Sequence, residues 1–217
     1  MLRPPHAERT RLEGPAGPLQ ALIETPATEV QGPQPVSAFA VVCHPHPLHG
    51  GTLDNKVVYT VARALEQLGA PAIRFNFRGV GTSAGSYDEG RGETADALAV
   101  IAYGRRRWPQ AALWLAGFSF GGAVAVRAAA AARPQRLIAV APGITTIALK
   151  DAAPPACPWL IVQGDADEVV APQAVRAWVD TLSPPPELQV LHGAGHFFHG
   201  RLNELRDVVL AFMASCA

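Results

Sequence analysis

Three residues that can together perform acyl transfer follow one another along the chain: Ser119, Asp167 and His196. Ser119 lies between two glycines, in the sequence Gly117-Phe118-Ser119-Phe120-Gly121. A serine hydroxyl is a weak nucleophile at neutral pH, so it needs a base within hydrogen-bond reach and a third group that orients this base. Histidine and a carboxylate can fill these two roles. The three residues therefore predict nucleophilic catalysis by Ser119.

Each partner of the serine has a rival nearby. Asp165 lies two residues before Asp167 in the segment Gly164-Asp165-Ala166-Asp167, and His192 lies four residues before His196. We favour His196 as the base because it follows Gly193-Ala194-Gly195 in a loop, whereas His192 lies at the end of an apolar run. Residue types alone do not decide whether Asp165 or Asp167 orients the histidine.

The apolar pattern indicates which elements must position these residues. Ala112–Ala116 predicts a buried strand before Ser119, and the Ala-rich segment from Gly122 onward predicts a helix after it. Further strands are expected at Phe39–Cys43, Ala72–Phe77, Leu137–Ala141, Trp159–Gln163 and Leu188–Leu191. Further helices are expected at Asn55–Leu68, with Asp54 as its cap and Gly69 as its stop, and at Glu93–Arg107, Gln173–Leu182 and Leu202–Ala214. Glu8–Glu13 and Leu19–Thr25 predict an opening hairpin.

Short apolar strands that alternate with helices are typical of a parallel sheet covered on both faces. We therefore expect a three-layer α/β domain with a mostly parallel sheet of about eight strands and an N-terminal antiparallel hairpin. The carboxyl ends of parallel strands meet at one edge of the sheet. Asp167 and His196 both follow strands at this edge, so we expect them to reach Ser119.

Composition limits the classes of function. The 217 residues predict a single domain, 1–217, in which about residues 1–8 are expected to be poorly ordered. The chain has 18 Lys and Arg against 18 Asp and Glu, which gives no electrostatic case for binding nucleic acid or a membrane surface. The N-terminus has no apolar signal region, and three widely spaced cysteines predict no disulfide framework, so we expect a cytoplasmic protein. The oligomeric state stays open.

Several motifs together resemble a known family. They are Cys43-His44-Pro45-His46-Pro47-Leu48-His49-Gly50-Gly51-Thr52, Arg74-Phe75-Asn76-Phe77-Arg78-Gly79-Val80-Gly81-Thr82-Ser83-Ala84-Gly85, the Ser119 segment and Gly164-Asp165-Ala166-Asp167. In this order they resemble the compact bacterial α/β-hydrolase-fold serine hydrolases related to dienelactone hydrolases. The resemblance implies Ser119 on a nucleophile elbow, His196 as base and then acid, and Asp167 as the residue that holds the imidazole. The family pattern G-x-x-D-x-x-V falls on Gly164, Asp167 and Val170, which favours Asp167 over Asp165.

An acyl-transfer serine also needs hydrogen-bond donors for the developing oxyanion. The resemblance implies the backbone N–H of Phe120 as the first donor. The second should come from the loop after Phe39–Cys43, where Pro45 and Pro47 have no N–H. His46 and Leu48 remain, and comparison with the family's His-Gly-x turn favours His46.

Other interpretations predict different functions. His44, His46 and His49 could hold a metal ion and serve a metal-dependent hydrolase, although the aspartate typical of such a motif is absent. Gly79-Val80-Gly81-Thr82-Ser83-Ala84 matches a dinucleotide-binding pattern, but more loop residues follow it where a helix should begin. Cys43 could suggest a cysteine hydrolase, but it is not on the elbow. A non-catalytic binding module would not require all three of Ser119, Asp167 and His196. We therefore expect no metal and no cofactor.

The expected substrate is a small acyl ester, cleaved through an acyl-enzyme. In this family a cap is commonly inserted after the strand that ends here at Ala141, and the next strand follows after only a short loop. An open site without a cap encloses little apolar surface, which favours short acyl groups. Five aromatic residues could line the acyl pocket or pack beneath it: Tyr87, Phe118, Phe120, Phe197 and Phe198.

Overall fold

A computed structural model of the protein describes residues 6–26, 36–147, 149 and 153–215. These residues form an eight-stranded sheet with the strand order β1-β2-β4-β3-β5-β6-β7-β8. Strands β3 to β8 are parallel to one another, whereas β2 is antiparallel to both of its neighbours, β1 and β4. The strands span β1 His6–Gly14, β2 Gly17–Thr25, β3 Ala38–Cys43, β4 Ala72–Phe75, β5 Ala112–Phe118, β6 Arg136–Val140, β7 Trp159–Gly164 and β8 Glu187–Leu191. The mostly parallel sheet with an opening hairpin is confirmed.

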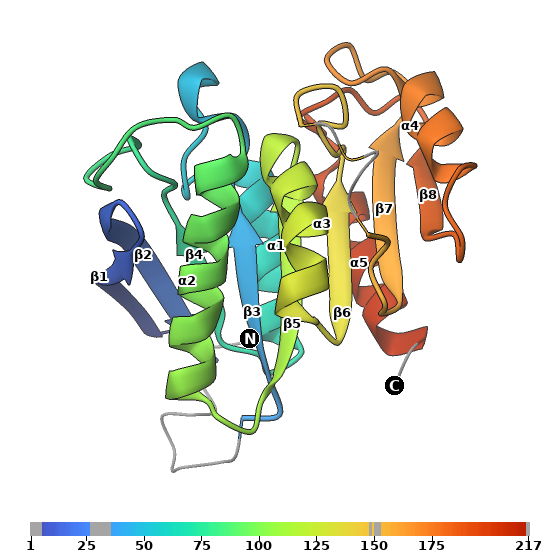
Figure 1. Ribbon diagram of the computed structural model, residues 1–217. Helices are drawn as coiled ribbons and strands as arrows, with labels where there is room; N and C mark the ends of the chain where they lie inside the picture. The colour runs from blue at the N-terminus through green and yellow to red at the C-terminus, as the bar shows by residue number, and fades with distance from the viewer. Residues whose placement is uncertain (1–5, 27–35, 148, 150–152, 216–217) are drawn as a thin grey trace.

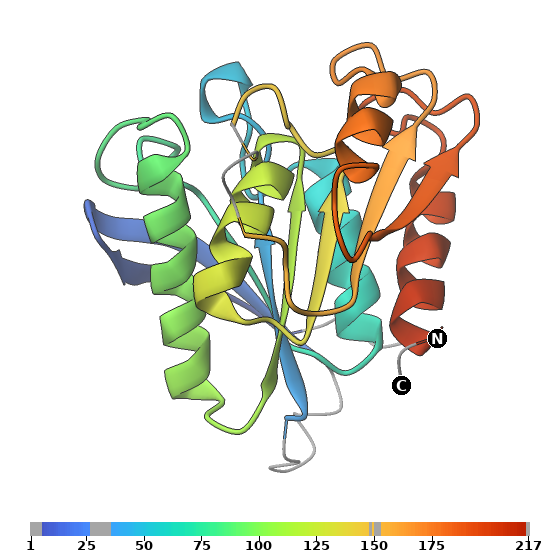
Figure 2. The ribbon, with the colours of Figure 1, turned by 45° about the vertical axis from the view of Figure 1, so that its right-hand side comes forward.

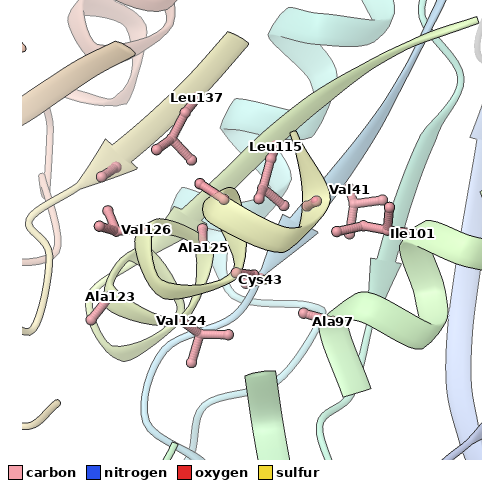
Figure 3. Packing of buried hydrophobic residues seen from close by; sticks show 14 of the residues in the cluster. Val41, Cys43, Ala97, Ile101, Leu115, Ala123, Val124, Ala125, Val126 and Leu137 are labelled. Carbon is pink, nitrogen blue, oxygen red and sulfur yellow. The ribbon is translucent and has the colours of Figure 1, made fainter. Parts of the chain in front are cut away.

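The helices cover both faces of the sheet (Figures 1 and 2). They are α1 Lys56–Gln67, α2 Arg91–Arg107, α3 Phe120–Ala132, α4 Pro172–Val179 and α5 Leu202–Ser215. Buried side chains of α2, α3 and α4 pack on one face, and those of α1 and α5 pack on the other. On the first face, Val41 and Leu115 of the central strands meet Ala97 and Ile101 of α2 and Val124 of α3 (Figure 3). The expected three-layer arrangement is confirmed.

The opening hairpin begins at His6, two residues before the start predicted from the sequence. His6, Ala7 and Glu8 pair with Thr25, Glu24 and Ile23 in the antiparallel register of β1 and β2. Residues 1–5 lie outside the described residues. The hairpin extends to His6 because each of these positions has a partner on β2.

Several element ends differ from the sequence prediction, and three of these differences have a local reason. Asn55, not Asp54, caps α1, and its side-chain oxygen accepts the backbone N–H groups of the two residues that follow Lys56. Helix α2 begins before Glu93, because the Glu93 carboxylate accepts the Gly90 N–H from inside the first turn, at 2.8 Å. Helix α4 ends at Val179, and the chain continues to Leu182 in tighter turns.

The connections after β3, β5, β7 and β8 leave the sheet at the edge that is uppermost in Figure 1. This edge carries Ser119, Asp167 and His196. Between β6 and β7 the described residues form only a connecting loop, with no strand or helix of a cap. No helix among the described residues is both long enough and apolar enough to span a membrane.

Candidate active site

Ser119 lies in the turn between β5 and α3, at the centre of the sheet. Its backbone angles are φ 54° and ψ −119°, a conformation that residues other than glycine rarely adopt. The turn is held on both sides, because the Ser119 N–H donates to the carbonyl of Val140 at 2.8 Å and the Ser119 carbonyl accepts the Gly143 N–H at 2.9 Å. These contacts are the geometry expected of a nucleophile elbow.

The glycines beside Ser119 permit close packing of the backbone. A Cβ on Gly117 would lie 2.1 Å from the carbonyl oxygen of Gly121, and a Cβ on Gly121 would lie 2.3 Å from that of His44. Such distances are shorter than any real contact. The start of α3 therefore packs directly on the end of β5 and on the loop after β3.

We expect Gly117→Ala to lower the free energy of unfolding by at least about 2 kcal/mol, because the new methyl group meets backbone atoms that cannot move aside. Urea unfolding would measure the change. The matched control is Gly69→Ala, where φ is +90° but a Cβ would meet nothing within 4 Å. It should cost only the backbone strain, about 1 kcal/mol. Equal losses in the two variants would contradict this account of the elbow.

Ser119, His196 and Asp167 form one chain of hydrogen bonds. His196 Nε2 lies 3.0 Å from Ser119 Oγ, and His196 Nδ1 lies 2.8 Å from Asp167 Oδ2. The Asp167 carboxylate accepts a hydrogen bond from Nδ1, so Nδ1 carries the proton. Nε2 is then free to accept the hydrogen bond of the Ser119 hydroxyl. All three residues are buried, with 8%, 2% and 7% of their surfaces exposed. The structure thus brings together the three residues that the sequence singled out.

The Asp167 carboxylate is held on both oxygens. Oδ1 accepts the backbone N–H groups of Val169 and Val170, at 2.9 and 2.7 Å, while Oδ2 faces His196. Burial raises the pKa of this carboxyl, but the hydrogen bonds from His196 and the two amides outweigh burial, and the pKa lies below its ordinary value. Asp167 is therefore ionised at neutral pH and able to orient an imidazole.

Asp165 and His192 form a separate, exposed pair. His192 Nδ1 lies 2.8 Å from Asp165 Oδ2, and the Gly193 N–H donates to Asp165 Oδ1. The His192 side chain is 89% exposed, in contrast to the buried His196. These contacts brace the turn after β8, and neither residue contacts Ser119 in the described hydrogen bonds.

Two backbone amides near Ser119 are available as donors. Phe120 is the first residue of α3, and among the described residues neither its N–H nor that of His46 has a hydrogen-bond acceptor. The rings of Phe120 and His46 lie 5.0 Å apart, which places the loop after β3 beside the start of α3. The Leu48 N–H, by contrast, donates to His46 Nδ1 at 3.2 Å. This contact favours His46 over Leu48 as the second donor.

The histidines after β3 do not converge on a common point. His44 is fully buried, its Nδ1 lies 2.6 Å from the Pro45 carbonyl, and its Nε2 accepts the Phe77 N–H at 3.0 Å. Burial lowers the pKa of His44 to about 4, against the raising effect of the Pro45 hydrogen bond. His46 and His49 stack on each other instead. Across the described ranges, no three His, Cys, Asp or Glu side chains are arranged to hold a metal ion.

The remaining features singled out from the sequence are Cys43, the glycine-rich loop after β4 and the aromatic residues near the site. Burial, with Asp96 nearby, raises the pKa of the Cys43 thiol, so it is not a thiolate nucleophile. The glycine-rich loop after β4 continues to Gly90 before a helix begins, which differs from a dinucleotide-binding turn. Phe118, Phe120 and Phe198 are buried in the core, whereas Phe197 is 41% exposed. Of the aromatic residues expected near the site, Phe197 and the partly buried Tyr87 are the more accessible.

The sequence analysis missed two residues that hold the site. Glu168 accepts the backbone N–H of His196 at 3.2 Å, and Gln163 donates to Asp167 Oδ2 at 2.9 Å. A polar residue within the buried, apolar strand Trp159–Gly164 was a signal that could have identified Gln163. Glu168 had no comparable signal, since an acidic residue in a loop is ordinary.

Comparison with known proteins identifies the family of this chain. The family model described as the alpha/beta hydrolase fold matches residues 48–142. An uncharacterized protein of Rickettsia prowazekii is 36% identical over an aligned length of 186 residues, and the alignment covers 81% of this chain and 78% of that protein. A crystal structure from Xanthomonas campestris, described as an α/β serine hydrolase without lid, is 47% identical, with a TM-score of 0.90 over 99% of this chain and 97% of that one. An α-β serine hydrolase homologue from Coxiella burnetii is 46% identical, with a TM-score of 0.88 over 94% and 96% of the two chains.

None of these descriptions mentions dienelactone hydrolases, so the relation to that group stays a prediction. The similarity to the Xanthomonas structure covers both chains almost completely, and the described residues between β6 and β7 here also form no cap. The chain belongs to the α/β-hydrolase fold family, among its compact serine hydrolases without a lid.

Proposed function

We propose that this protein is a serine hydrolase that cleaves small acyl esters through an acyl-enzyme on Ser119. The observation that carries the proposal is the continuous pair of hydrogen bonds from Ser119 Oγ through His196 to Asp167, at 3.0 and 2.8 Å. Membership of the lidless serine hydrolases supports it. The carboxylester as substrate is our proposal and rests on the chemistry of this site.

In the first half of the reaction, Ser119 Oγ attacks the ester carbonyl while its proton passes to His196 Nε2. Asp167 keeps the imidazole oriented and stabilises the positive charge that it gains. The oxyanion accepts hydrogen bonds from the N–H groups of Phe120 and His46, each worth about 3 kcal/mol in the transition state. The tetrahedral intermediate then expels the alcohol, which takes the proton from His196, and the acyl group remains on Ser119.

In the second half, water replaces the alcohol. His196 Nε2 accepts a proton from the water as its oxygen attacks the acyl carbon, and the same proton then passes to Ser119 Oγ as the acid is released. No group other than these residues and water is needed for the balance of atoms and protons. The site can therefore perform the whole cycle without a cofactor.

The absence of a cap among the described residues predicts a preference for short acyl groups. In a series of p-nitrophenyl esters, we expect kcat/KM to be highest from acetate to butyrate and about tenfold lower for decanoate, because little apolar surface encloses a long chain. Initial rates below KM would measure the series. A rise in kcat/KM with every added methylene would contradict an open site, and no turnover of any ester would contradict the esterase proposal.

A further inference from the structure

Gln163 is a buried amide at the end of β7, directly behind the candidate site. Only 1% of its surface is exposed. Its Nε2 faces three oxygens: Asp167 Oδ2 at 2.9 Å, the Val170 carbonyl at 3.2 Å and the Gly164 carbonyl at 3.3 Å. All three are acceptors, so the amide nitrogen must point toward them and the orientation of the side chain follows from its contacts.

The other end of this amide is not stabilised. Gln163 Oε1 is buried and has no hydrogen-bond partner among the described residues. A buried acceptor without a donor destabilises the folded state. An apolar side chain of similar length, such as methionine, would fill the same space without this cost. Packing therefore does not explain the amide, whereas its hydrogen bonds to Asp167 and to the two backbone carbonyls can.

Gln163 contacts the same oxygen of Asp167 that accepts the hydrogen bond of His196. Asp167 Oδ2 accepts both the Gln163 amide and His196 Nδ1, while Oδ1 accepts two backbone N–H groups. Gln163 also bonds the Val170 carbonyl, which ties the turn that carries Asp167 to the end of β7. The amide thus limits rotation of the carboxylate from the side opposite the backbone donors.

We propose that Gln163 is a positioning residue, whose amide holds Asp167 Oδ2 where it accepts the hydrogen bond of His196 Nδ1–H. The inference rests on the proposed function, because the positioned pair acts on Ser119. Gln163 does not touch a substrate or the reacting atoms, so it acts only through Asp167.

The first variant is Gln163→Met, which removes the donor and keeps a side chain of similar length. The measurements are kcat and KM for p-nitrophenyl acetate and the rate at which a fluorophosphonate labels Ser119. We expect kcat and the labelling rate to fall about tenfold with KM within about twofold, because a displaced carboxylate orients the base less well without affecting substrate binding. Urea unfolding should show that the variant remains folded under the assay conditions, since the unpaired Oε1 is removed together with the donor to the Val170 carbonyl.

The second variant, Gln163→Glu, distinguishes hydrogen bonding from packing. When protonated, the new carboxyl can donate its O–H to Asp167 Oδ2, and two carboxyl groups at this distance share one proton. We expect near-normal kcat at about pH 6 and a fall of about tenfold relative to the unsubstituted protein by about pH 9, where the shared proton is lost. Gln163→Met should be low across the whole range.

Other ionisable groups near Gln163 are the same in all variants. Asp167 and His196 lie on the side of its amide nitrogen. Gln163 also lines a groove between α4 and β8, whose ionisable lining residues are Arg176, Asp180 and His192. The matched control is Gln189→Met on β8, whose exposed side chain bonds only Glu187 among the described residues. It should leave kcat and the pH profile unchanged.

An unchanged kcat, labelling rate and pH profile in Gln163→Met and Gln163→Glu, with the unsubstituted protein active, would overturn the positioning role and leave the proposed function intact. If Gln163→Met does not fold, the pH profile of Gln163→Glu decides alone, because a packing role predicts no new loss of activity at alkaline pH. An unsubstituted protein that neither cleaves esters nor reacts with fluorophosphonate would overturn the proposed function, and the positioning role with it.

Discussion

Ser119→Ala is expected to lower kcat for p-nitrophenyl acetate by on the order of 10⁴-fold or more, because no other described hydroxyl or thiol has the hydrogen bond to His196 Nε2 that makes Ser119 Oγ a nucleophile. The only change is the loss of one oxygen atom. Burst kinetics should vanish together with turnover, since both require the acyl-enzyme. Stopped-flow assays of both proteins would measure the effect.

The variant must be shown to be folded, because residue 119 keeps a backbone φ of 54° that alanine also finds strained. Its urea unfolding curve should therefore match that of the unsubstituted protein. Ser37→Ala serves as the control, since Ser37 is exposed and lies before β3, at the edge of the sheet opposite the site. Full retention of activity in a folded Ser119→Ala would remove Ser119 from the mechanism.

The layers of the fold could be predicted because each strand and helix carries its own pattern. The apolar run at Leu137–Ala141 forms β6 within one residue at each end, and Gly69 stops α1 as expected, with φ +90°. Such patterns are local and depend on burial alone. Element ends were less predictable where a side chain competes with the backbone. For this reason Asn55 caps α1, where the sequence predicted Asp54.

The partners of the site could be predicted from chain order, but their contacts could not. Asp167 and Asp165 lie two residues apart, and only the pairing of the loops after β7 and β8 decides which one faces His196. In that pairing the Ala166 N–H donates to the Ala194 carbonyl at 3.1 Å. A Cβ on Gly164 would lie 2.1 Å from the same carbonyl, so this close approach depends on glycine. Contacts between segments about 30 residues apart leave no periodic signal in the sequence.

Asp167→Asn is expected to lower kcat by about 10³ to 10⁴-fold, because every group around the carboxylate is a donor. Oδ1 accepts two backbone N–H groups, and Oδ2 accepts Gln163 Nε2 and His196 Nδ1. An asparagine NH₂ must face one of these pairs. Facing His196, it would favour the tautomer that protonates Nε2, which cannot then accept the proton of Ser119. Facing the backbone, it would oppose two N–H groups and displace the turn.

Asp165→Asn is the matched control, since it makes the same chemical change two residues away. Asp165 contacts the exposed His192 and the Gly193 N–H rather than His196, so kcat should stay within about twofold. Steady-state assays of the two variants, with unfolding curves to exclude a loss of folded protein, give a direct comparison. A larger loss in Asp165→Asn than in Asp167→Asn would mean that the wrong carboxylate has been assigned. Equal, small losses would mean that the His196 ring acts without a carboxylate partner, because Asp165 and Asp167 are the two carboxylates that contact an imidazole nitrogen at this edge among the described residues.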